Sequence, residues 1–386
     1  MTGSRAIYLD YHATTPVDPR VLQAMMPYFT EVFGNPASAS HSFGWKAMEA
    51  VELARRQVAA LIGAQAREII FTSGATESNN FALKGVTETP REGRKRIVTS
   101  AVEHKSILET FTKLAMCGWD VEIVGVDRGG RLKLDALAKA VTPDTALVSV
   151  MAANNEIGTV QPLAEIGAIA HAAGALFHVD GAQAVGKVPI DVNAMHIDLL
   201  SLTGHKMYGP KGCGALYVRK RTELAPMIRG GGQERGLRAG TLNVPGIVGL
   251  GCACDICRKE MTEEAARLRH LRDRLLSGLT AGLDGVIVNG TLDERLPQNL
   301  HVSFTGVDGE SLLLGIGDIA VSSGSACQSS SGKPSHVLSA IMGDENVPSA
   351  SIRFGLGRTT TASEIDFVVD KFTTVVTKLR KLHPVH

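Results

Sequence analysis

Apolar runs of strand length alternate with segments of helical spacing through the middle of the chain. The runs lie at 68–71, 96–100, 121–126, 146–151, 174–180, 197–202 and 214–218, and 162–173 is one of the helical segments between them. Strands that alternate with helices favour βαβ units and a mainly parallel sheet. We therefore expect an α/β fold here, with helices on both faces of the sheet.

The last third of the chain has a different pattern. Helical spacing with increasing charge runs from Val244 to about Leu279, and shorter strand-like and helical stretches follow at 299–304, 310–316, 319–321, 351–355 and 361–382. This pattern predicts a long helix that leads into a smaller α+β domain. The expected domains are a large one of residues 16–257 and a small one of residues 1–15 and 258–386, which carries a loop at 322–334.

The composition is that of an ordinary soluble protein. The 386 residues are 44% hydrophobic and 20% charged, with a net charge of +1. That charge gives no electrostatic reason for binding nucleic acid or an anionic membrane. No apolar run reaches the length of a transmembrane helix, and the N-terminus lacks the apolar region of a signal peptide. We therefore expect a cytoplasmic location.

In a reducing compartment the six cysteines are expected to be free. Cys252, Cys254 and Cys257 lie close together in the sequence, which raises the possibility of a metal site. They fall in a helical pattern of small residues, however, and no second Cys/His cluster faces them. We therefore expect these three side chains to pack inside the protein and expect no bound metal.

Several polar residues fall just after the ends of the expected strands. They are Thr76, His104, Asn155, Asp180, Gln183 and Lys206. In open α/β sheets, ligands bind at this edge. No G-x-G-x-x-G motif opens an early βαβ unit, which argues against a nicotinamide cofactor. The convergence of these residues predicts a site for a different ligand.

Lys206 and Asp180 point to a particular cofactor. A lysine on a short rigid loop at a strand end can be partly desolvated, and its neutral amine can then hold an aldehyde as a Schiff base. By itself Lys206 could be an ordinary lysine in a Gly/Pro turn, and Asp180 could cap a helix before Ala182. Together they match the arrangement for pyridoxal phosphate (PLP), in which the aspartate pairs with the pyridine nitrogen.

Other residues could complete such a site. Gly74, Ala75 and Thr76 follow a strand and open a helix, whose free N–H groups can hold a phosphate. Plain N-capping would explain this turn equally well. Thr203 and His205 flank the lysine and could hydrogen-bond the same phosphate. His104 could stack on a flat ring and move protons, although a lone histidine is more often structural.

Three later features carry further chemistry. The glycine-rich, cationic segment 230–241, which ends at Thr241, could touch a phosphate, cross a dimer interface or serve as a flexible linker. The loop 322–334 is small, polar and expected to be mobile, and its reactive side chain is Cys327. That cysteine could carry a group away from a substrate or be an incidental surface thiol. Arg353 presents a fork that suits a substrate carboxylate.

Across nearly its whole length the chain resembles the cysteine desulfurases of the NifS/IscS type, in the class V aminotransferase family of fold-type I PLP enzymes. The matching motifs are LDYHATT (9–15), GNPAS (34–38), TSGATESNN (72–80), EH (103–104), NNEIG (154–158), HVDGAQ (178–183), GHK (204–206), the segment 230–241, SSGSAC (322–327) and RFG (353–355). The resemblance implies a mainly parallel seven-stranded sheet with helices on both faces, plus a smaller α+β domain.

The resemblance also implies roles for residues of the site. Lys206 would hold the cofactor and move protons, His104 would stack on its ring and serve in acid–base steps, and Asp180 would pair with its nitrogen. The remaining cofactor contacts would come from Ala75, Thr76, Gln183, Thr203 and His205, with Thr241 reaching over from the other subunit of a homodimer. Asn155 and Arg353 would orient the carboxylate of L-cysteine. Cys327 would take the sulfur as a persulfide, and alanine would be released.

The resemblance implies sulfur-acceptor proteins as partners, such as an iron–sulfur scaffold, and the loop around Cys327 looks like that of group I of the family. Two departures stand out. Thr203 replaces a serine of many members but keeps the hydroxyl, and the chain ends at His386, whereas Isc-type members extend further with a tail used in scaffold docking. The alternatives are a selenocysteine lyase, a class V aminotransferase, or a sulfur carrier or scaffold without catalysis. Cys327 could also be a transient iron–sulfur ligand.

Overall fold

A computed structural model describes residues 6–89, 93–323 and 335–382. Its largest element is a seven-stranded sheet with the order β2-β8-β7-β6-β5-β3-β4. The strands are β2 (Ile69–Thr72), β3 (Arg96–Ser100), β4 (Asp120–Val124), β5 (Thr145–Met151), β6 (Leu176–Asp180), β7 (Leu199–Thr203) and β8 (Gly214–Val218). Only β8 runs antiparallel to its neighbours in this sheet. The expected mainly parallel, seven-stranded α/β fold is confirmed.

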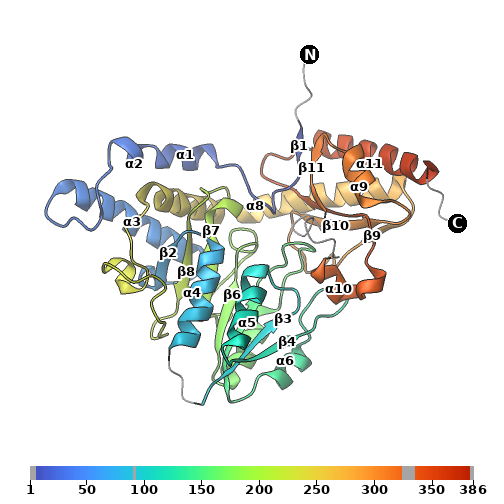
Figure 1. Cartoon of the computed structure of the whole chain (residues 1–386). Coiled ribbons are helices and arrows are strands. Elements are labelled where there is room, and N and C mark those ends of the chain that lie inside the picture. Colours follow the sequence, from blue (N-terminus) through green and yellow to red (C-terminus); the bar gives the residue numbers. More distant parts are fainter. Residues whose placement is uncertain (1–5, 90–92, 324–334, 383–386) are drawn as a thin grey trace.

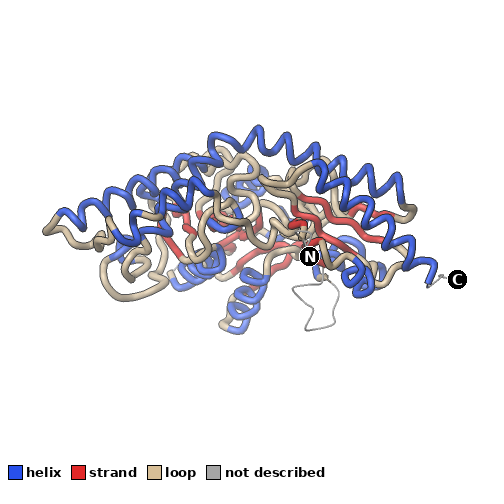
Figure 2. The backbone as a smooth tube through the Cα atoms, turned by 90° about the horizontal axis from the view of Figure 1, so that it is seen from above, coloured by secondary structure: helices blue, strands red, loops and turns tan. Residues whose placement is uncertain are grey.

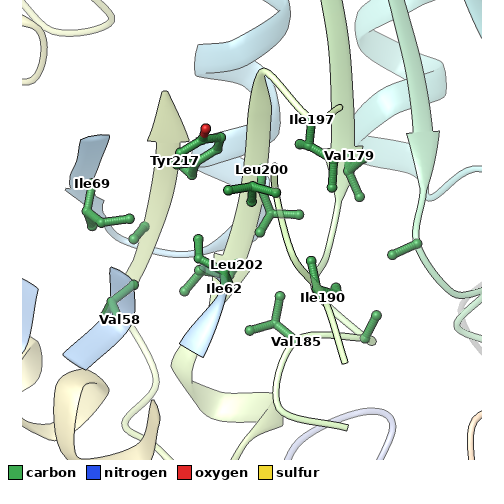
Figure 3. Close-up of a cluster of buried hydrophobic side chains, with 14 of the residues drawn as sticks. Val58, Ile62, Ile69, Val179, Val185, Ile190, Ile197, Leu200, Leu202 and Tyr217 are labelled. Carbon is green, nitrogen blue, oxygen red and sulfur yellow. The ribbon is translucent and has the colours of Figure 1, made fainter. Parts of the chain in front are cut away.

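Apart from the edge strand β4, most of the sheet is buried on both faces, which explains why its central strands are continuous apolar runs. Leu200 and Leu202 of β7 pack on one face with Tyr217, as Figure 3 shows. Leu199 packs on the opposite face, against residues such as Phe81. Successive side chains of a strand point to opposite faces, so a strand covered on both sides must be apolar at every position.

Helices surround this sheet, and the four that follow β2 connect successive strands from β2 to β6 (Figure 1). The helices of this part of the chain are α1 (Pro19–Met25), α2 (Pro27–Thr30), α3 (Ser42–Leu61), α4 (Ala75–Glu88), α5 (Lys105–Met116), α6 (Leu134–Ala140) and α7 (Leu163–Ala172), with short 3-10 turns at η1 (Ala66–Glu68), η2 (Gly204–Lys206) and η3 (Gln233–Gly236). In the view from above, helices flank the strands on both sides (Figure 2).

A second group of strands lies at the other end of the molecule (Figure 1). It contains a four-stranded antiparallel sheet, β12 (Ser322–Ser323), β13 (Ser351–Gly355), β10 (Asn299–Phe304) and β9 (Val286–Val288), and the parallel pair β1 (Ile7–Tyr8) and β11 (Ile319–Ala320). The helices of this part are α9 (Gly309–Gly315), α10 (His336–Met342) and α11 (Ala362–Leu382), with the turn η5 (Asp344–Asn346). The expected α+β character of this region is confirmed.

One long helix, α8 (Val244–Gly282), joins the two parts (Figure 1). Its first half, including Leu250 and Cys254, packs in the core on one face of the large sheet. Its second half, including Leu271 and Leu275, packs in a separate core formed with β10, β13 and α11. The domain boundary expected after residue 257 falls inside this helix, between the two cores, and the division itself stays a prediction.

Two of the three clustered cysteines are buried, as expected. Cys254 and Cys257 have exposed fractions of 0% and 2%, and Cys252 lies half-buried on the same helix. The Cys254 Sγ lies 3.7 Å from Met207 Sδ, just beyond the lysine loop. In the described part of the chain, no group of His, Cys, Asp and Glu is arranged to hold a metal ion. Among those same residues, no helix is long and apolar enough to cross a membrane.

The glycine-rich segment is docked onto the large sheet through Glu234. The Arg55 guanidinium donates two hydrogen bonds of 2.8 Å to the Glu234 carboxylate, which also accepts a 2.7 Å bond from the backbone N–H of Phe71 in β2. Glu234 and Arg235 both have a positive φ, which costs energy in residues other than glycine. Arg238 makes a second ion pair, with Glu77 of α4. These contacts favour a docked segment over a flexible linker.

We expect Glu234→Ala to lower the free energy of unfolding by about 3–5 kcal/mol, because the buried Arg55 guanidinium loses its buried, two-bond counter-charge and keeps only the more exposed Glu52 at 3.0 Å. Chemical denaturation followed by fluorescence measures this loss. The matched control is Asp366→Ala, which breaks the exposed ion pair with Arg274 and should leave the midpoint almost unchanged. Equal effects of the two substitutions would contradict the assigned role of Glu234.

Candidate active site

The polar residues that follow the strand ends meet around one cavity of roughly 630 Å³. The expected site residues that line it are Ala75, Thr76, His104, Asn155, Asp180, Gln183, Thr203, His205, Lys206 and Arg353. The cavity lies at the carboxyl ends of the central parallel strands, where β5, β6 and β7 lie side by side. The sequence argument that strand-end residues converge is therefore supported by their positions.

The two other expected residues are Thr241, which is not among the residues that line this cavity, and Cys327. Thr241 is exposed, in the segment that precedes α8. Cys327 lies outside the described residues. The chain on either side of the undescribed segment 324–334 does reach the site. Ser322 lines the cavity, and Ser335 donates a 2.5 Å hydrogen bond to the carboxylate of Glu156, the residue after Asn155.

Asp180 ends β6 and is 4% exposed. Its Oδ1 accepts a 2.9 Å hydrogen bond from the backbone N–H of Ala182, and its Oδ2 accepts a 2.8 Å bond from the Asn79 side chain. Asp180 therefore caps the following turn and also faces the cavity, so the two interpretations of this residue are compatible. Because amide donors hold both oxygens, the carboxylate is fixed in position at the cavity wall.

His104 is the N-cap of α5, and its ring faces the same cavity. Its Nδ1 accepts a 3.1 Å hydrogen bond from the backbone N–H of Ser106, which places the proton of a neutral ring on Nε2. Burial lowers the pKa of His104 below its ordinary value, and the positive charge of Lys206 adds to this effect against the opposing charge of Asp180. A neutral ring with a donor at Nε2 can stack on a flat ligand and donate a hydrogen bond.

Lys206 closes the 3-10 turn η2 directly after β7. Tyr208, two residues after Lys206, adopts a left-handed backbone conformation (φ 64°), which surrounding contacts must stabilise. Its ring centroid lies 4.3 Å from Lys187 Nζ and 4.1 Å from Arg358 Cζ, and Thr15 Oγ1 accepts a 2.8 Å bond from its backbone N–H. The sequence predicted a rigid lysine loop, and these contacts supply the rigidity.

The part of the cavity next to α4 suits an anion. Gly74 is the N-cap of α4, and the backbone N–H groups of the first helical residues, Ala75 and Thr76, have no acceptor within the helix. Lys206 and Lys211 also line the cavity and add positive charge. Burial and these two lysines lower the pKa of His205 to about 4, so its ring is neutral and can accept or donate one hydrogen bond.

Arg353 extends from β13 and forms the wall on the side of the small sheet. Its Nη1 donates a 2.8 Å hydrogen bond to the backbone carbonyl of Asn155, and its Nη2 donates to Asp10 Oδ1 at 2.8 Å and to Ser322 Oγ at 3.1 Å. Its Nε is buried and makes no hydrogen bond within the described structure. Both terminal nitrogens of the guanidinium are therefore held in place at the cavity wall.

Sequence reasoning missed three residues of this site. His12 lines the cavity although it was seen only as part of a polar opening segment and a family motif. Asn79 and Ser106 also line it, and the Asn79 side chain donates to Ser106 Oγ at 2.9 Å as well as to Asp180. Asn79 lies four residues after Ala75 in α4, so the helical period that placed Ala75 at the cavity could have placed Asn79 there too.

These residues fit one kind of ligand. A buried carboxylate suits a protonated ring nitrogen, the N-terminus of α4 suits a phosphate, and the lysine between them can bond to an aldehyde. The neutral His104 ring offers a surface for stacking. The contacts that hold Asp180 and the lysine loop show that the site is built to place these groups and not merely lined by them.

Comparison with known proteins agrees with this chemistry. Residues 7–368 match the family described as Aminotransferase class-V. The chain is 54% identical over 382 residues to a curated relative named cysteine desulfurase IscS from Anaeromyxobacter sp. (strain K), covering 98% of this chain and 95% of the relative. It is 52% identical over 380 residues to a probable mitochondrial cysteine desulfurase from Dictyostelium discoideum, covering 98% and 84% of the two chains.

Solved structures show the same relationship. A NifS-like protein superposes with a TM-score of 0.90 at 42% identity, covering 97% of this chain and all 100% of the other. A structure titled SspA in complex with cysteine superposes with a TM-score of 0.80 at 38% identity, covering 91% of this chain and 98% of the other.

Proposed function

The chain belongs to the class V aminotransferase family and is a PLP-dependent cysteine desulfurase, and from this premise we propose which of its side chains carry the reaction. L-cysteine is the substrate that this activity implies. The observation that carries the proposal is the meeting of Lys206, Asp180, His104 and Arg353 around one cavity. When bound, the cofactor withdraws electrons from the substrate's carbon skeleton.

In this proposal, the Lys206 amine would hold the cofactor and would also move protons on the substrate carbons. Asp180 keeps the ring nitrogen protonated. The phosphate binds at the N-terminus of α4, at Ala75 and Thr76, and to Thr203 and His205. These assignments rest on the cavity lining and on the chemistry of each group.

The remaining cavity residues complete the assignment. His104 stacks on the ring and serves in acid–base steps. Gln183 contacts the ring oxygen. Asn155 and Arg353 orient the substrate carboxylate, because the carbonyl of Asn155 and the carboxylate of Asp10 hold the two arms of the Arg353 fork at the cavity wall.

We expect Arg353→Lys to raise the KM for L-cysteine about tenfold to hundredfold, because a lysine cannot reproduce the planar set of donors. Steady-state alanine formation measures this change. Cysteamine, which lacks the carboxylate of L-cysteine, is the control compound. Its ability to perturb the cofactor absorbance should change little in the variant, and an equal loss for both compounds would instead indicate a structural role.

Cys327 is proposed as the nucleophile. Its thiolate attacks the substrate sulfur, the carbon–sulfur bond breaks, and the electron pair stays with the carbon skeleton, which is protonated and released as alanine. The sulfur remains on Cys327 as a persulfide. Cys327 is five residues beyond Ser322, so the chain permits at most roughly 18 Å between their Cα atoms. Since Ser322 lines the cavity, this limit is compatible with attack inside it.

We further propose that the protein acts as a homodimer and passes sulfur to acceptor proteins such as an iron–sulfur scaffold. A second hollow of roughly 570 Å³ lies between α3 and the turn η3, lined by Met48, Arg55 and Glu234 among others. The exposed aromatic side chains Phe43 and Trp45 lie on the same helix. A second copy covering this face would bring a residue such as the exposed Thr241 to its neighbour's site. Analytical ultracentrifugation measures the oligomeric state directly.

The test of the function is peptide mass analysis of PLP-loaded protein after addition of L-cysteine without a reductant, with alanine measured in parallel. We expect the Cys327 peptide to gain one sulfur atom and alanine to form in equal amount. Alanine without that gain would mean that sulfur leaves directly, as in a lyase. Neither product, together with a change of cofactor absorbance by amino acids, would favour transamination. The relatives found do not favour these two alternatives.

A further inference from the structure

His12 links the wall of the cavity to the small sheet. It is 2% exposed and lies between Gln183, which lines the cavity, and Asn299, the first residue of β10. Its Nδ1 is 3.0 Å from Gln183 Oε1, and its Nε2 is 3.0 Å from Asn299 Nδ2. Both ring nitrogens of His12 are thus engaged by amide side chains, and each amide could in principle be turned either way.

Arg295 fixes the orientation of the Asn299 amide. The buried guanidinium donates through Nη1 to Asn299 Oδ1 at 3.0 Å, and burial lowers its pKa only to about 9, so it stays charged at neutral pH. Asn299 Nδ2 donates a 3.0 Å bond to the backbone carbonyl of Glu156. A turned amide would place its N–H groups against the guanidinium and its oxygen against that carbonyl. Asn299 therefore presents an N–H group to His12.

The orientation of Asn299 sets the tautomer of His12. Burial and the positive charge of Arg353 lower the pKa of His12 to about 3, so the ring is neutral and has one donor and one acceptor. Because Nε2 accepts from Asn299, the proton is on Nδ1. The other charged groups that act on His12 are Lys206 and Lys187, and both also oppose its protonation.

The tautomer of His12 then sets the amide of Gln183. His12 Nδ1–H donates to Gln183 Oε1, and Gln183 Nε2 donates a 3.1 Å bond to the backbone carbonyl of His12. One N–H of the Gln183 amide is left for the cavity that this residue lines. With its oxygen held by His12, Gln183 can only act as a donor toward a ligand.

We propose that His12 is a positioning residue, which holds Gln183 as a hydrogen-bond donor to the ring oxygen of the cofactor through the chain Arg295–Asn299–His12–Gln183. This inference rests on the proposed function, because it takes the Gln183 contact from there. A hydrogen-bond donor at the ring oxygen would stabilise the negative charge of that oxygen, and a proton on the Lys206 nitrogen bonded to the cofactor would become less favourable. The hydrogen-bonded series from Arg295 to Gln183 would therefore lower the pKa at which the visible absorbance band of the holoenzyme changes.

The experiment is a spectrophotometric pH titration of the holoenzyme without substrate. Burial lowers the pKa of the cavity histidines His104 and His205, so neither is expected to titrate in the alkaline range. We expect His12→Phe and Gln183→Met each to raise the pKa of the visible band by about one unit, the value of one hydrogen bond to a charged group. In the double variant the shift should equal that of either single one, because both remove the same contact.

Asn299→Asp provides a second, nearly isosteric test. An aspartate keeps the contact with Arg295 but can only accept from His12, which moves the ring proton to Nε2 and removes the donor at Nδ1 that holds Gln183 Oε1. The visible band should shift in the same direction as in His12→Phe although His12 is still present. This variant keeps the inference testable if the larger phenylalanine prevents folding or cofactor binding.

His301→Phe is the matched control. His301 is also a fully buried, neutral histidine of β10, held by the side chain of Asn289 at 2.8 Å, but it does not line the cavity. Its replacement should leave the pKa of the band unchanged. An equal shift of the pKa of the band in His301→Phe would overturn the inference. Additive shifts in the double variant would also overturn it. A third contradicting result would be an unchanged pKa in His12→Phe together with a raised pKa in Gln183→Met. No shift in Gln183→Met itself would overturn the proposed cofactor contact and the inference with it.

Discussion

Lys206→Ala is expected to lower kcat for alanine formation by roughly 10³-fold or more, because the variant loses both the covalent hold on the cofactor and the base that moves protons on the substrate. The protein should still fold, since contacts of Tyr208 and Thr15 hold the loop in place. It should also still bind PLP through the phosphate site and Asp180. The visible band of the lysine-linked cofactor should be absent, so absorbance and activity give independent measurements.

Lys211→Ala is the control for this prediction. Lys211 lines the same cavity and carries the same charge, but it is exposed and lies beyond the turn that positions Lys206. Loss of its charge should weaken phosphate binding modestly and keep the visible band. If Lys206→Ala retained kcat within about tenfold of the parent protein, the site described here would not be where the chemistry occurs.

Cys327→Ser should abolish sulfur transfer and lower alanine formation by roughly 10³-fold or more, because a serine hydroxyl is not ionised near neutral pH and cannot replace a thiolate as the acceptor of sulfur. The cavity residues are untouched, so L-cysteine should still change the visible absorbance of the holoenzyme. Binding without turnover is the signature that separates a missing nucleophile from a damaged site.

Cys117→Ser is the matched control for the thiol. Cys117 is exposed at the end of α5 and does not line the cavity. Its replacement should leave alanine formation and the persulfide on the Cys327 peptide unchanged. Alanine formation at the parent rate in Cys327→Ser would show that the enzyme releases sulfur without a persulfide on this residue.

Local sequence pattern accounts for most of the fold. Apolar runs such as those of β6 and β8 predicted strands within a residue or two, because a strand buried on both faces must be apolar along its length. The alternation of strands and helices predicted a mainly parallel sheet, and parallel strands bring their carboxyl ends to one edge. Lys206, Asp180 and His104 could therefore be placed together before any distance was known.

The pattern could not give the direction of β8 or the docking of residues 230–241. β8 follows β7 after a short connection and pairs with it antiparallel, and its apolar run has the same appearance as those of the parallel strands. The segment 230–241 is glycine-rich and reads as a linker, but Glu234 reaches back to Arg55 and fixes it on β2. A single carboxylate in a polar segment does not reveal a partner 179 residues away.

The chemistry of this site can be inferred from the amino-acid sequence, because a lysine, an aspartate and a histidine at strand ends are local features whose properties follow from residue type and position. The contacts that hold those groups in place depend on the folded molecule. His12 is 171 residues from Gln183 and 287 residues from Asn299, and the direction of its proton depends on both. Local pattern records whether a position is buried. Hydrogen bonds between distant segments depend on how the whole chain packs, so the donors and acceptors that orient the site appear only in the folded molecule.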